Sequence, residues 1–182
     1  MVEIAPSMLG ADFGRMRYSA ELVAPHSAYL HMDVMDGHFV PNLTMGPDLV
    51  MSLNGIAPLD VHLMVTEPSS FIKDFKDAGA EIISVHVEAN DPLNALKLIK
   101  EHDLKAGIAL NPSTSEEAIK PFVDYADLIL VMSVEPGYCG QEFHENAIER
   151  VKNYKEAYPL SLIHISEPTR PLYISYAVFC LK

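Results

Sequence analysis

One stretch, residues 30–42, reads LHMDVMDGHFVPN and changes from apolar to polar within a few residues. Its first half has the β-branched and apolar character of a strand over 29–34. Side chains alternate between the two faces of a strand, so His31, Asp33 and Met35 point the same way. The stretch therefore predicts a buried strand that ends in an imidazole and a carboxylate.

Working outward, five other strand-like runs repeat at the spacing of a strand–helix unit. They lie at 2–8, 59–65, 82–87, 106–110 and 128–134. Amphipathic, helix-like runs lie near 13–23, 47–53, 69–78, 92–102, 115–122 and 145–157. Several strand-like runs are apolar on both faces, which is typical of parallel strands covered by helices. The alternation predicts an α/β fold built from about six βα units.

Polar side chains at the strand ends favour one α/β architecture over another. They are Ser7, His31, Asp33, His62, His86, Glu88, Asn111, Ser133 and Glu135. A (β/α)8 TIM barrel gathers its site from the carboxyl ends of many strands, whereas a doubly wound sheet concentrates it at one switch point. We therefore predict a (β/α)8 barrel, incomplete because six units leave it unclosed.

Two of these strand ends form a candidate metal site. In the run DVHLM, Asp60, His62 and Met64 share a face, as His31 and Asp33 do on the preceding strand. Two imidazoles and a carboxylate supply three of the four ligands of a divalent ion. Such ligands suit zinc or iron, and manganese or cobalt are admissible. Considered alone, each histidine is better interpreted as a hydrogen-bonded polar residue at a strand end. Considered together, two histidines and an aspartate aligned on neighbouring strands favour a metal site.

A second segment, residues 134–141, reads VEPGYCGQ directly after a strand. Gly137 and Gly140 permit the backbone to turn its amides toward a ligand, although Pro-Gly is also an ordinary turn. No base is indicated near Cys139, so a plain loop thiol is the better interpretation. His86 and Glu88 read more readily as a hydrogen-bonded structural pair than as further ligands.

The composition of the chain argues against several kinds of binding partner and cellular location. The formal net charge of −12 disfavours nucleic acid and anionic membranes as partners. Cys139 and Cys180 form no CxxC pair, which favours a reducing cytoplasm. The N-terminus has no signal-peptide pattern, and no apolar run approaches the ~20 residues of a membrane span. The oligomeric state is left open, a homo-oligomer included.

Four ordered elements now support a family assignment. They are Pro6-Ser7-Met8-Leu9 with Asp12, then residues 30–42, 60–65 and 131–141. Together they resemble the ribulose-phosphate 3-epimerase family, and the resemblance runs from residue 2 to about 158. It implies a metal-dependent barrel that acts on a small sugar phosphate.

The resemblance also implies roles for single residues. His31, Asp33 and His62 match the metal ligands, and Asp33 matches the carboxylate that moves the C3 proton on one face of the sugar. The matches to substrate-contacting groups are Ser7, His62, Met35, Met64, Met132, Gly137, Tyr138, Cys139 and Gly140. The methionines match those around the enediolate, and residues 137–140 match the loop on the phosphate side. The family usually has Gly-Phe-Gly-Gly there, so Tyr138 and Cys139 depart from the pattern.

The last 23 positions, 160–182, depart from the family altogether. The resemblance implies a second catalytic carboxylate in an Asp-Gly-Gly element, which also supplies the fourth metal ligand, and the sequence contains no such element. Residues 160–182, LSLIHISEPTRPLYISYAVFCLK, instead resemble a translated sequencing-library adapter. We predict a truncated domain over 1–159 and a non-native tail over 160–182, although residues 160–165 alternate like a seventh strand.

Three other interpretations stand beside epimerisation of D-ribulose 5-phosphate to D-xylulose 5-phosphate. A D-allulose-6-phosphate 3-epimerase uses the same chemistry on a longer sugar. A non-catalytic fragment is indicated by the missing carboxylate and the six-unit barrel. A hydrolase with the same metal cluster is a distant alternative, because no nucleophile motif accompanies it.

Overall fold

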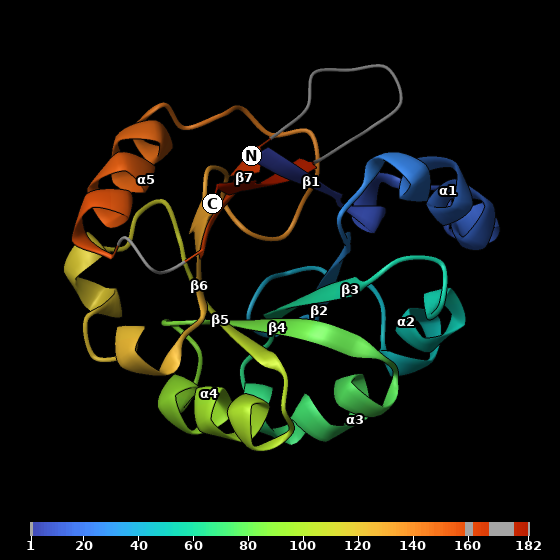
Figure 1. Ribbon diagram of the computed structural model, residues 1–182, viewed down its shortest axis with the longest axis horizontal. Coiled ribbons are helices and arrows are strands. Elements are labelled where there is room, and N and C mark those ends of the chain that lie inside the picture. Colours follow the sequence, from blue (N-terminus) through green and yellow to red (C-terminus); the bar gives the residue numbers. More distant parts are fainter. Residues whose placement is uncertain (1, 159–161, 168–176, 182) are drawn as a thin grey trace.

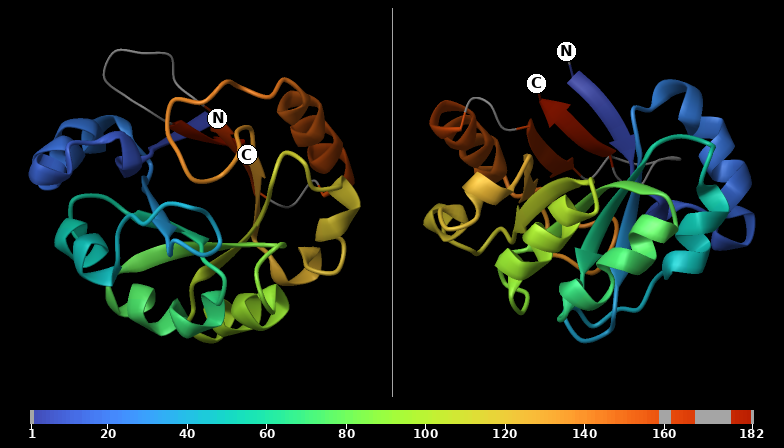
Figure 2. Two further views of the ribbon diagram at one scale, coloured as in Figure 1. Left: turned by 180° about the vertical axis from the view of Figure 1, so that it is seen from behind. Right: turned by 60° about the horizontal axis from the view of Figure 1, so that its bottom comes forward.

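A computed structural model of the chain describes residues 2–158, 162–167 and 177–181. It has an α/β fold in which one sheet of eight strands curves around a centre and the helices lie on its outside (Figures 1 and 2). The α/β class and the barrel-type arrangement predicted from the sequence are confirmed.

The strands are β1 (Val2–Pro6), β2 (Leu30–Met35), β3 (Leu59–Met64), β4 (Ala80–His86), β5 (Lys105–Leu110), β6 (Leu128–Met132), β7 (Leu162–Glu167) and β8 (Ala177–Leu181). The α-helices are α1 (Met16–Val23), α2 (Pro47–Leu53), α3 (Ile72–Asp77), α4 (Pro92–Glu101) and α5 (Asn146–Ala157). Short 3-10 turns are η1 (Met8–Gly10), η2 (Phe13–Arg15), η3 (Ala24–His26), η4 (Pro68–Ser70), η5 (Glu116–Ile119) and η6 (Val123–Tyr125).

The strand order is β1-β8-β7-β6-β5-β4-β3-β2, and β2 to β7 pair in parallel. The two ends of this order, β1 and β2, meet at a bridge between Ser7 and His31. Strand β8 runs antiparallel to both of its neighbours, unlike the eighth strand of a complete (β/α)8 barrel. All six strands expected from the sequence are present as β1 to β6.

Two strands, β7 and β8, occupy the space between β6 and β1 that six units alone would leave open. Within the alternating run, residues 162–165 pair with β6, whose edge would otherwise expose unpaired backbone groups. Strand pairing does not test where the native domain ends, so the boundary at 159 stays a prediction.

The helix expected over 115–122 is wrong in type. The 3-10 turn η5 lies within this range, and a second 3-10 turn, η6, follows it. Ser115 caps the first of them by accepting the amide of Glu117. Pro121 then lacks the amide that an α-helix needs and its ring clashes with the carbonyl four residues back, so the helix cannot continue.

Alternation along β2 divides its side chains between two cores. Leu30, Met32 and Val34 pack with the helices in the large outer core, and His31 and Asp33 lie on the opposite, inner face. A smaller apolar cluster fills the inside with Ala5, Ile82, Ala109, Leu128, Leu130, Met132 and Val134. The barrel interior is thus filled by apolar side chains that lie beneath the polar strand ends.

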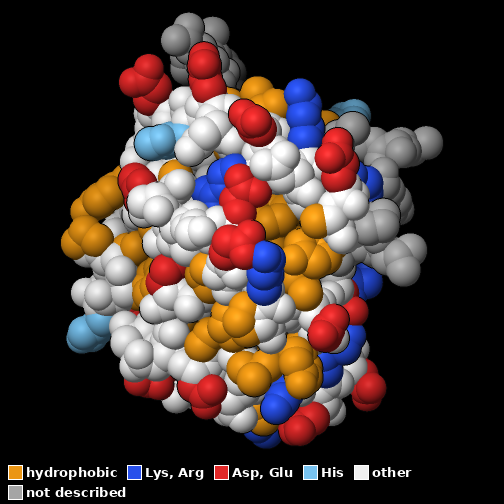
Figure 3. Space-filling view, turned by 90° about the vertical axis from the view of Figure 1, so that its left-hand side faces the viewer, with side chains coloured by type: hydrophobic (Ala, Val, Ile, Leu, Met, Phe, Trp, Pro, Cys, Tyr) orange, Lys and Arg blue, Asp and Glu red, His pale blue; other side chains and the backbone are white. Residues whose placement is uncertain are grey.

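Acidic side chains are spread over the face that carries α5, with lysines and arginines between them (Figure 3). The net charge of −12 therefore forms no single patch on this face. No helix in the described ranges is long and apolar enough to cross a membrane.

Candidate active site

The register between β2 and β3 builds the centre of the site. His31 pairs with Asp60, Asp33 with His62 and Met35 with Met64, all across adjacent parallel strands. Because paired residues in register point to the same side, each pair faces the barrel interior together. Alternation predicted the shared faces, and the register adds which residues meet.

Asp33 lies at the middle of this polar cluster and is 8% exposed. Its Oδ1 atom is 2.9 Å from Nδ1 of His62 and 3.4 Å from Nε2 of His31. Its Oδ2 atom accepts the hydroxyl of Ser7 at 2.5 Å. Three contacts, from Ser7 directly after β1, from His31 on β2 and from His62 on β3, therefore fix one carboxylate.

His31 is oriented by a carboxylate behind it. Its Nδ1 atom is 2.7 Å from Oδ2 of Asp60, which leaves Nε2 directed at Asp33. Burial lowers the pKa of His31, but the charges of Asp33 and Asp60 outweigh burial and raise it to about 10. In the absence of a metal, the imidazole is therefore held as a cation between two carboxylates.

His62 has the opposite electrostatic character. Burial lowers its pKa to about 4, and the neighbouring His86 and His31 add to this effect against the attraction of Asp33. Burial would raise the pKa of Asp33, yet the charge and hydrogen bonds of His31, followed by those of His62, hold it well below its usual range. The centre thus contains an ionised carboxylate and a neutral imidazole at neutral pH.

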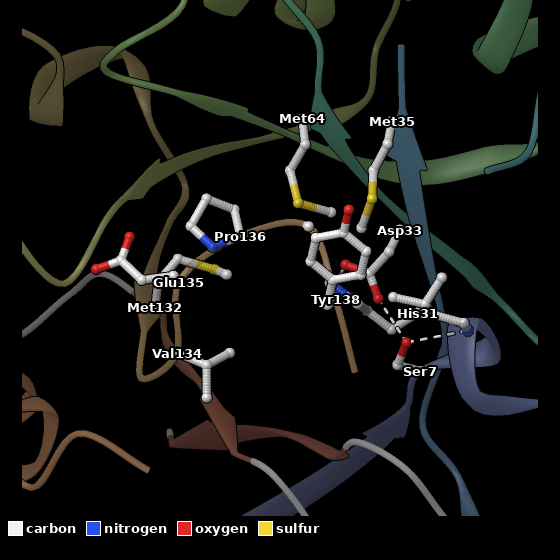
Figure 4. Close-up of a pocket in the computed structure, with 12 residues that line it drawn as sticks. Ser7, His31, Asp33, Met35, Met64, Met132, Val134, Glu135, Pro136 and Tyr138 are labelled. Atoms are coloured by element: carbon white, nitrogen blue, oxygen red, sulfur yellow. Dashed lines mark hydrogen bonds and ion pairs between the residues drawn. The ribbon is translucent and has the colours of Figure 1, made fainter. Parts of the chain in front are cut away.

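A pocket opens above this centre at the carboxyl ends of the strands (Figure 4). It is lined by Ser7, Leu9, His31, Asp33, Met35, Met64, Met132, Val134, Glu135, Pro136, Gly137 and Tyr138. The sulfur-bearing ends of Met35 and Met64 lie side by side near Asp33, and Met132 lies across the pocket (Figure 4). Apolar side chains therefore surround one ionised group.

Most of the predicted site residues meet at this pocket. Ser7, His31, Asp33, the three methionines, Gly137 and Tyr138 line it directly. His62 lies behind Asp33, at hydrogen-bond distance from it. Cys139 and Gly140 belong to the same loop but do not line the pocket, and Cys139 is exposed.

The loop after β6 forms the outer wall. The Asn42 amide donates to the carbonyl of Gly137 at 2.8 Å, and the Tyr138 hydroxyl donates to the carbonyl of Pro41 at 3.0 Å. Gly137 has a φ of +122°, a conformation that L side chains rarely adopt, and a Cβ there would also meet Val40. Glycine is thus required where this loop touches the loop after β2.

The cluster of His31, Asp33 and His62 fits a divalent cation. Each of the three offers one ligand atom, all are buried, and these atoms lie within 4.8 Å of one another. Ligand atoms about 2 Å from one tetrahedral ion lie about 3.3 Å apart. The separations of 2.9 and 3.4 Å around Asp33 Oδ1 are close to that value.

Comparison with known proteins identifies the family of the chain. Residues 3–166 match the model of the ribulose-phosphate 3 epimerase family. The chain belongs to this family. Ribulose-phosphate 3-epimerase of Bacillus subtilis (strain 168) is 45% identical over 159 residues, which are 85% of this chain and 73% of the relative. The enzyme of that name from Aquifex aeolicus (strain VF5) is 45% identical over 157 residues, or 84% and 71% of the two chains.

Solved structures support the fold alone. The 3-keto-L-gulonate-6-phosphate decarboxylase of Vibrio cholerae superposes with a TM-score of 0.66 at 13% identity, covering 90% of this chain and 77% of that one. The chain is thus a member of an isomerase family, and this membership supports epimerisation of a pentose phosphate.

Three apolar residues that line the pocket were not predicted as site residues from the sequence. Leu9, Val134 and Pro136 flank residues that were singled out, but nothing in their side chains signals a ligand. Glu135 was noted only as a polar strand end, and its carboxylate points away from Asp33 (Figure 4). Hydrophobic walls are set by loop geometry, which periodicity does not encode.

Proposed function

We propose that the pocket epimerises C3 of a ketose phosphate, converting D-ribulose 5-phosphate to D-xylulose 5-phosphate. One observation carries this proposal: a buried, ionised Asp33 lies between two imidazoles beneath a ring of methionines. Family membership and the names of the relatives support it.

The three ligands His31, Asp33 and His62 would hold a divalent cation, with zinc or iron preferred and manganese or cobalt admissible. When bound, the ion would supply Lewis-acid polarisation of the C2 ketone, which lowers the cost of removing the adjacent proton by several kcal/mol. Asp60 would keep His31 oriented toward it through the bond at Nδ1.

Asp33 is proposed to remove or return the C3 proton on one face of the sugar. Ser7 holds its Oδ2 atom and His62 faces its Oδ1 atom, so the carboxylate cannot rotate away from the pocket. Met35, Met64 and Met132 exclude water around the reacting carbon and offer no acidic proton, which limits side reactions.

The phosphate is proposed to lie beside the loop after β6. Gly137 and Tyr138 line the pocket on that side, and the backbone turn at Gly137 suits amide contacts to an anion. Cys139 and Gly140 would support this loop from outside the lining.

Inversion at C3 needs an acid on the opposite face from Asp33. Among the described residues that line the pocket, the other carboxylate is Glu135, which points away (Figure 4). The experiment must therefore separate proton removal from inversion.

We would incubate the zinc-loaded chain with D-ribulose 5-phosphate in D2O and follow both epimers by proton NMR. Deuterium at C3 is the expected result, and D-xylulose 5-phosphate that carries it would show that an acid also acts on the opposite face. Exchange of the C3 proton without inversion would support Asp33 as the base and the fragment interpretation for the opposite face. A folded, metal-loaded chain that does neither would contradict the proposal.

Metal removal is the control within the same assay. Chelation should abolish exchange, and restored zinc, iron, manganese or cobalt should recover it to different extents. A parallel run with D-allulose 6-phosphate tests the longer sugar, and faster exchange on that substrate would replace the pentose phosphate in the proposal.

We also propose that the native domain comprises residues 1–159 and that 160–182 is a non-native tail. The resemblance of 160–182 to a translated adapter supports this boundary. An independent nucleotide read past codon 159 that finds a different continuation would agree with it. The same tail encoded in the genome would contradict it.

A further inference from the structure

The polar network does not end at His62. Its Nε2 atom is 2.8 Å from Nε2 of His86, and the two rings are stacked with centroids 4.9 Å apart. His86, at the end of β4, is fully buried, and its Nδ1 atom is 3.0 Å from Oε2 of Glu88. A line of contacts thus runs from Asp33 through two imidazoles to a second carboxylate.

Glu88 sets the direction of these hydrogen bonds. Burial raises its pKa, but the hydrogen bond and charge of His86, with the donors Thr114 and Asn111, outweigh burial and lower it to about 2. Its Oε1 atom already accepts the Asn111 amide at 2.9 Å and the Thr114 hydroxyl. An ionised carboxylate only accepts, so Nδ1 of His86 must donate to it.

We propose that His86 and Glu88 are positioning residues that hold His62 in one tautomer, with the Nδ1 lone pair directed at the cation site. The Nε2 atoms of His62 and His86 lie 2.8 Å apart, so one of them donates to the other. With a cation bound at Nδ1 of His62, the donor is Nε2 of His62 and the acceptor is Nε2 of His86, whose Nδ1 donates to Glu88. Nδ1 of His62 then carries a lone pair, 2.9 Å from the carboxylate oxygen of Asp33. The inference rests on the proposed function, because a cation between these two acceptors makes the arrangement favourable.

The residues that donate hydrogen bonds to Glu88 are themselves held in place. Arg150 on α5 is buried and donates to the carbonyl of Asn111 at 3.0 Å and to that of Thr114 at 3.0 Å. Together with His86, these two residues donate to Glu88. The carboxylate therefore has a rigid base, as an orienting group requires.

Both ligand histidines would then be oriented by a carboxylate, one directly and one through another imidazole. His31 contacts the carboxylate of Asp60 directly at 2.7 Å, whereas His62 reaches that of Glu88 through one intervening imidazole. Each imidazole presents its other nitrogen to Asp33. Outer partners of this kind fix both the tautomer and the ring orientation of metal-binding histidines.

The test compares variants at His86 and Glu88 in the full chain. His86→Leu removes the acceptor for Nε2 of His62, whereas His86→Gln keeps an acceptor oxygen near that position. Glu88→Gln leaves one amide oxygen for three donors. Glu81→Gln is the matched control, because Glu81 is exposed on the same strand and outside the network.

Zinc affinity, measured by competition with a chromophoric chelator, is the first readout. We expect His86→Leu to weaken it about 10- to 100-fold, with a smaller loss for Glu88→Gln. His86→Gln should recover most of the affinity, and Glu81→Gln should leave it unchanged. Thermal melting checks that each variant folds.

The second readout is nitrogen-15 NMR of the histidine rings, which reports which nitrogen of His62 carries the proton in the zinc-loaded protein. We expect the proton on Nε2. A folded His86→Leu chain with unchanged zinc affinity overturns the positioning role alone. A proton on Nδ1 would show that this nitrogen does not bind the cation, which overturns this inference together with the role of His62 as a ligand. If the unmodified chain binds no zinc, the proposed metal chemistry and this inference fail together.

Discussion

The two walls of the pocket are built by different means. The wall made by β1, β2 and β3 carries Ser7, His31 and Asp33, all buried and joined by side-chain contacts of 2.5 to 3.4 Å. The wall made by the loop after β6 carries Tyr138, which is 55% exposed, and is tied down by two hydrogen bonds to Pro41 and Asn42.

The difference indicates where the family can vary. Chemistry needs atoms fixed to within a fraction of an ångström, and strands provide this more reliably than loops. The two departures from the usual family pattern, Tyr138 and Cys139, both fall in the loop wall. We therefore expect substitutions in the strand wall to have the larger effects on activity.

The largest effect is expected at Asp33. Asp33→Asn keeps the shape of the side chain but removes its charge, so both proton transfer and cation binding suffer. The rate of C3 proton exchange should fall about 10²- to 10⁴-fold. Deuterium incorporation measures it, with thermal melting as the folding control. A variant that retained more than a tenth of the rate would remove Asp33 from its proposed role.

Next in size is a packing change inside the barrel, between β4 and β5 beside the strand wall. A Cβ on Gly107 of β5 would lie 2.1 Å from Oγ of Ser84 on β4, inside the barrel. Gly107→Ala should lower the free energy of unfolding by about 1–3 kcal/mol, as overpacking does. Gly46→Ala is the control, since no atom lies within 4 Å of its Cβ position. Equal urea midpoints for the two variants would show that the barrel interior is not tightly packed.

A smaller effect concerns the pH dependence of stability at Glu88. The pKa of this group is about 2 in the fold, below its ordinary value of 4.5, so its stabilising contribution is full above about pH 4.5 and is lost as the pH falls toward 2. The difference in unfolding free energy between the natural chain and Glu88→Gln should therefore shrink between pH 6 and pH 3. Glu81→Gln should show no such change, and parallel curves for Glu88→Gln would contradict the assignment.

The smallest effect is expected in the loop wall. Tyr138→Phe removes the hydroxyl that donates to Pro41 but keeps the ring over the pocket. Loss of about 0.5 kcal/mol corresponds to a two- to threefold rise in KM, with kcat unchanged. Tyr18→Phe, exposed on α1, is the control. A tenfold loss of kcat would mean that the loop wall takes part in the chemistry.

The sequence predicted much of the strand wall because alternation is a strong signal. The shared faces of His31 with Asp33, and of Asp60 with His62, follow directly from period-two patterning. The pairing of His31 with Asp60 and of Asp33 with His62 does not, because register depends on how two separate strands align.

The loop wall was less predictable. Gly137 and Tyr138 reach the pocket, whereas Cys139 and Gly140, one and two residues farther, do not. The direction of the loop depends on tertiary contacts such as the hydrogen bond from the Asn42 amide to the carbonyl of Gly137. These two residues lie far apart in the sequence. The expected helix over 115–122 was wrong for a local reason, the proline at 121.

Arg150 has a consequence for the order in which the site is assembled during synthesis. Its guanidinium donates hydrogen bonds to the carbonyls of Asn111, Pro112 and Thr114, although its helix lies nearly forty residues farther along the chain. A nascent chain released only as far as β5 already contains Asp33, His62 and Glu88, yet it lacks the clamp that steadies the partners of Glu88. We therefore expect the centre of the barrel to be completed late, after the helix that carries Arg150 has left the ribosome and docked.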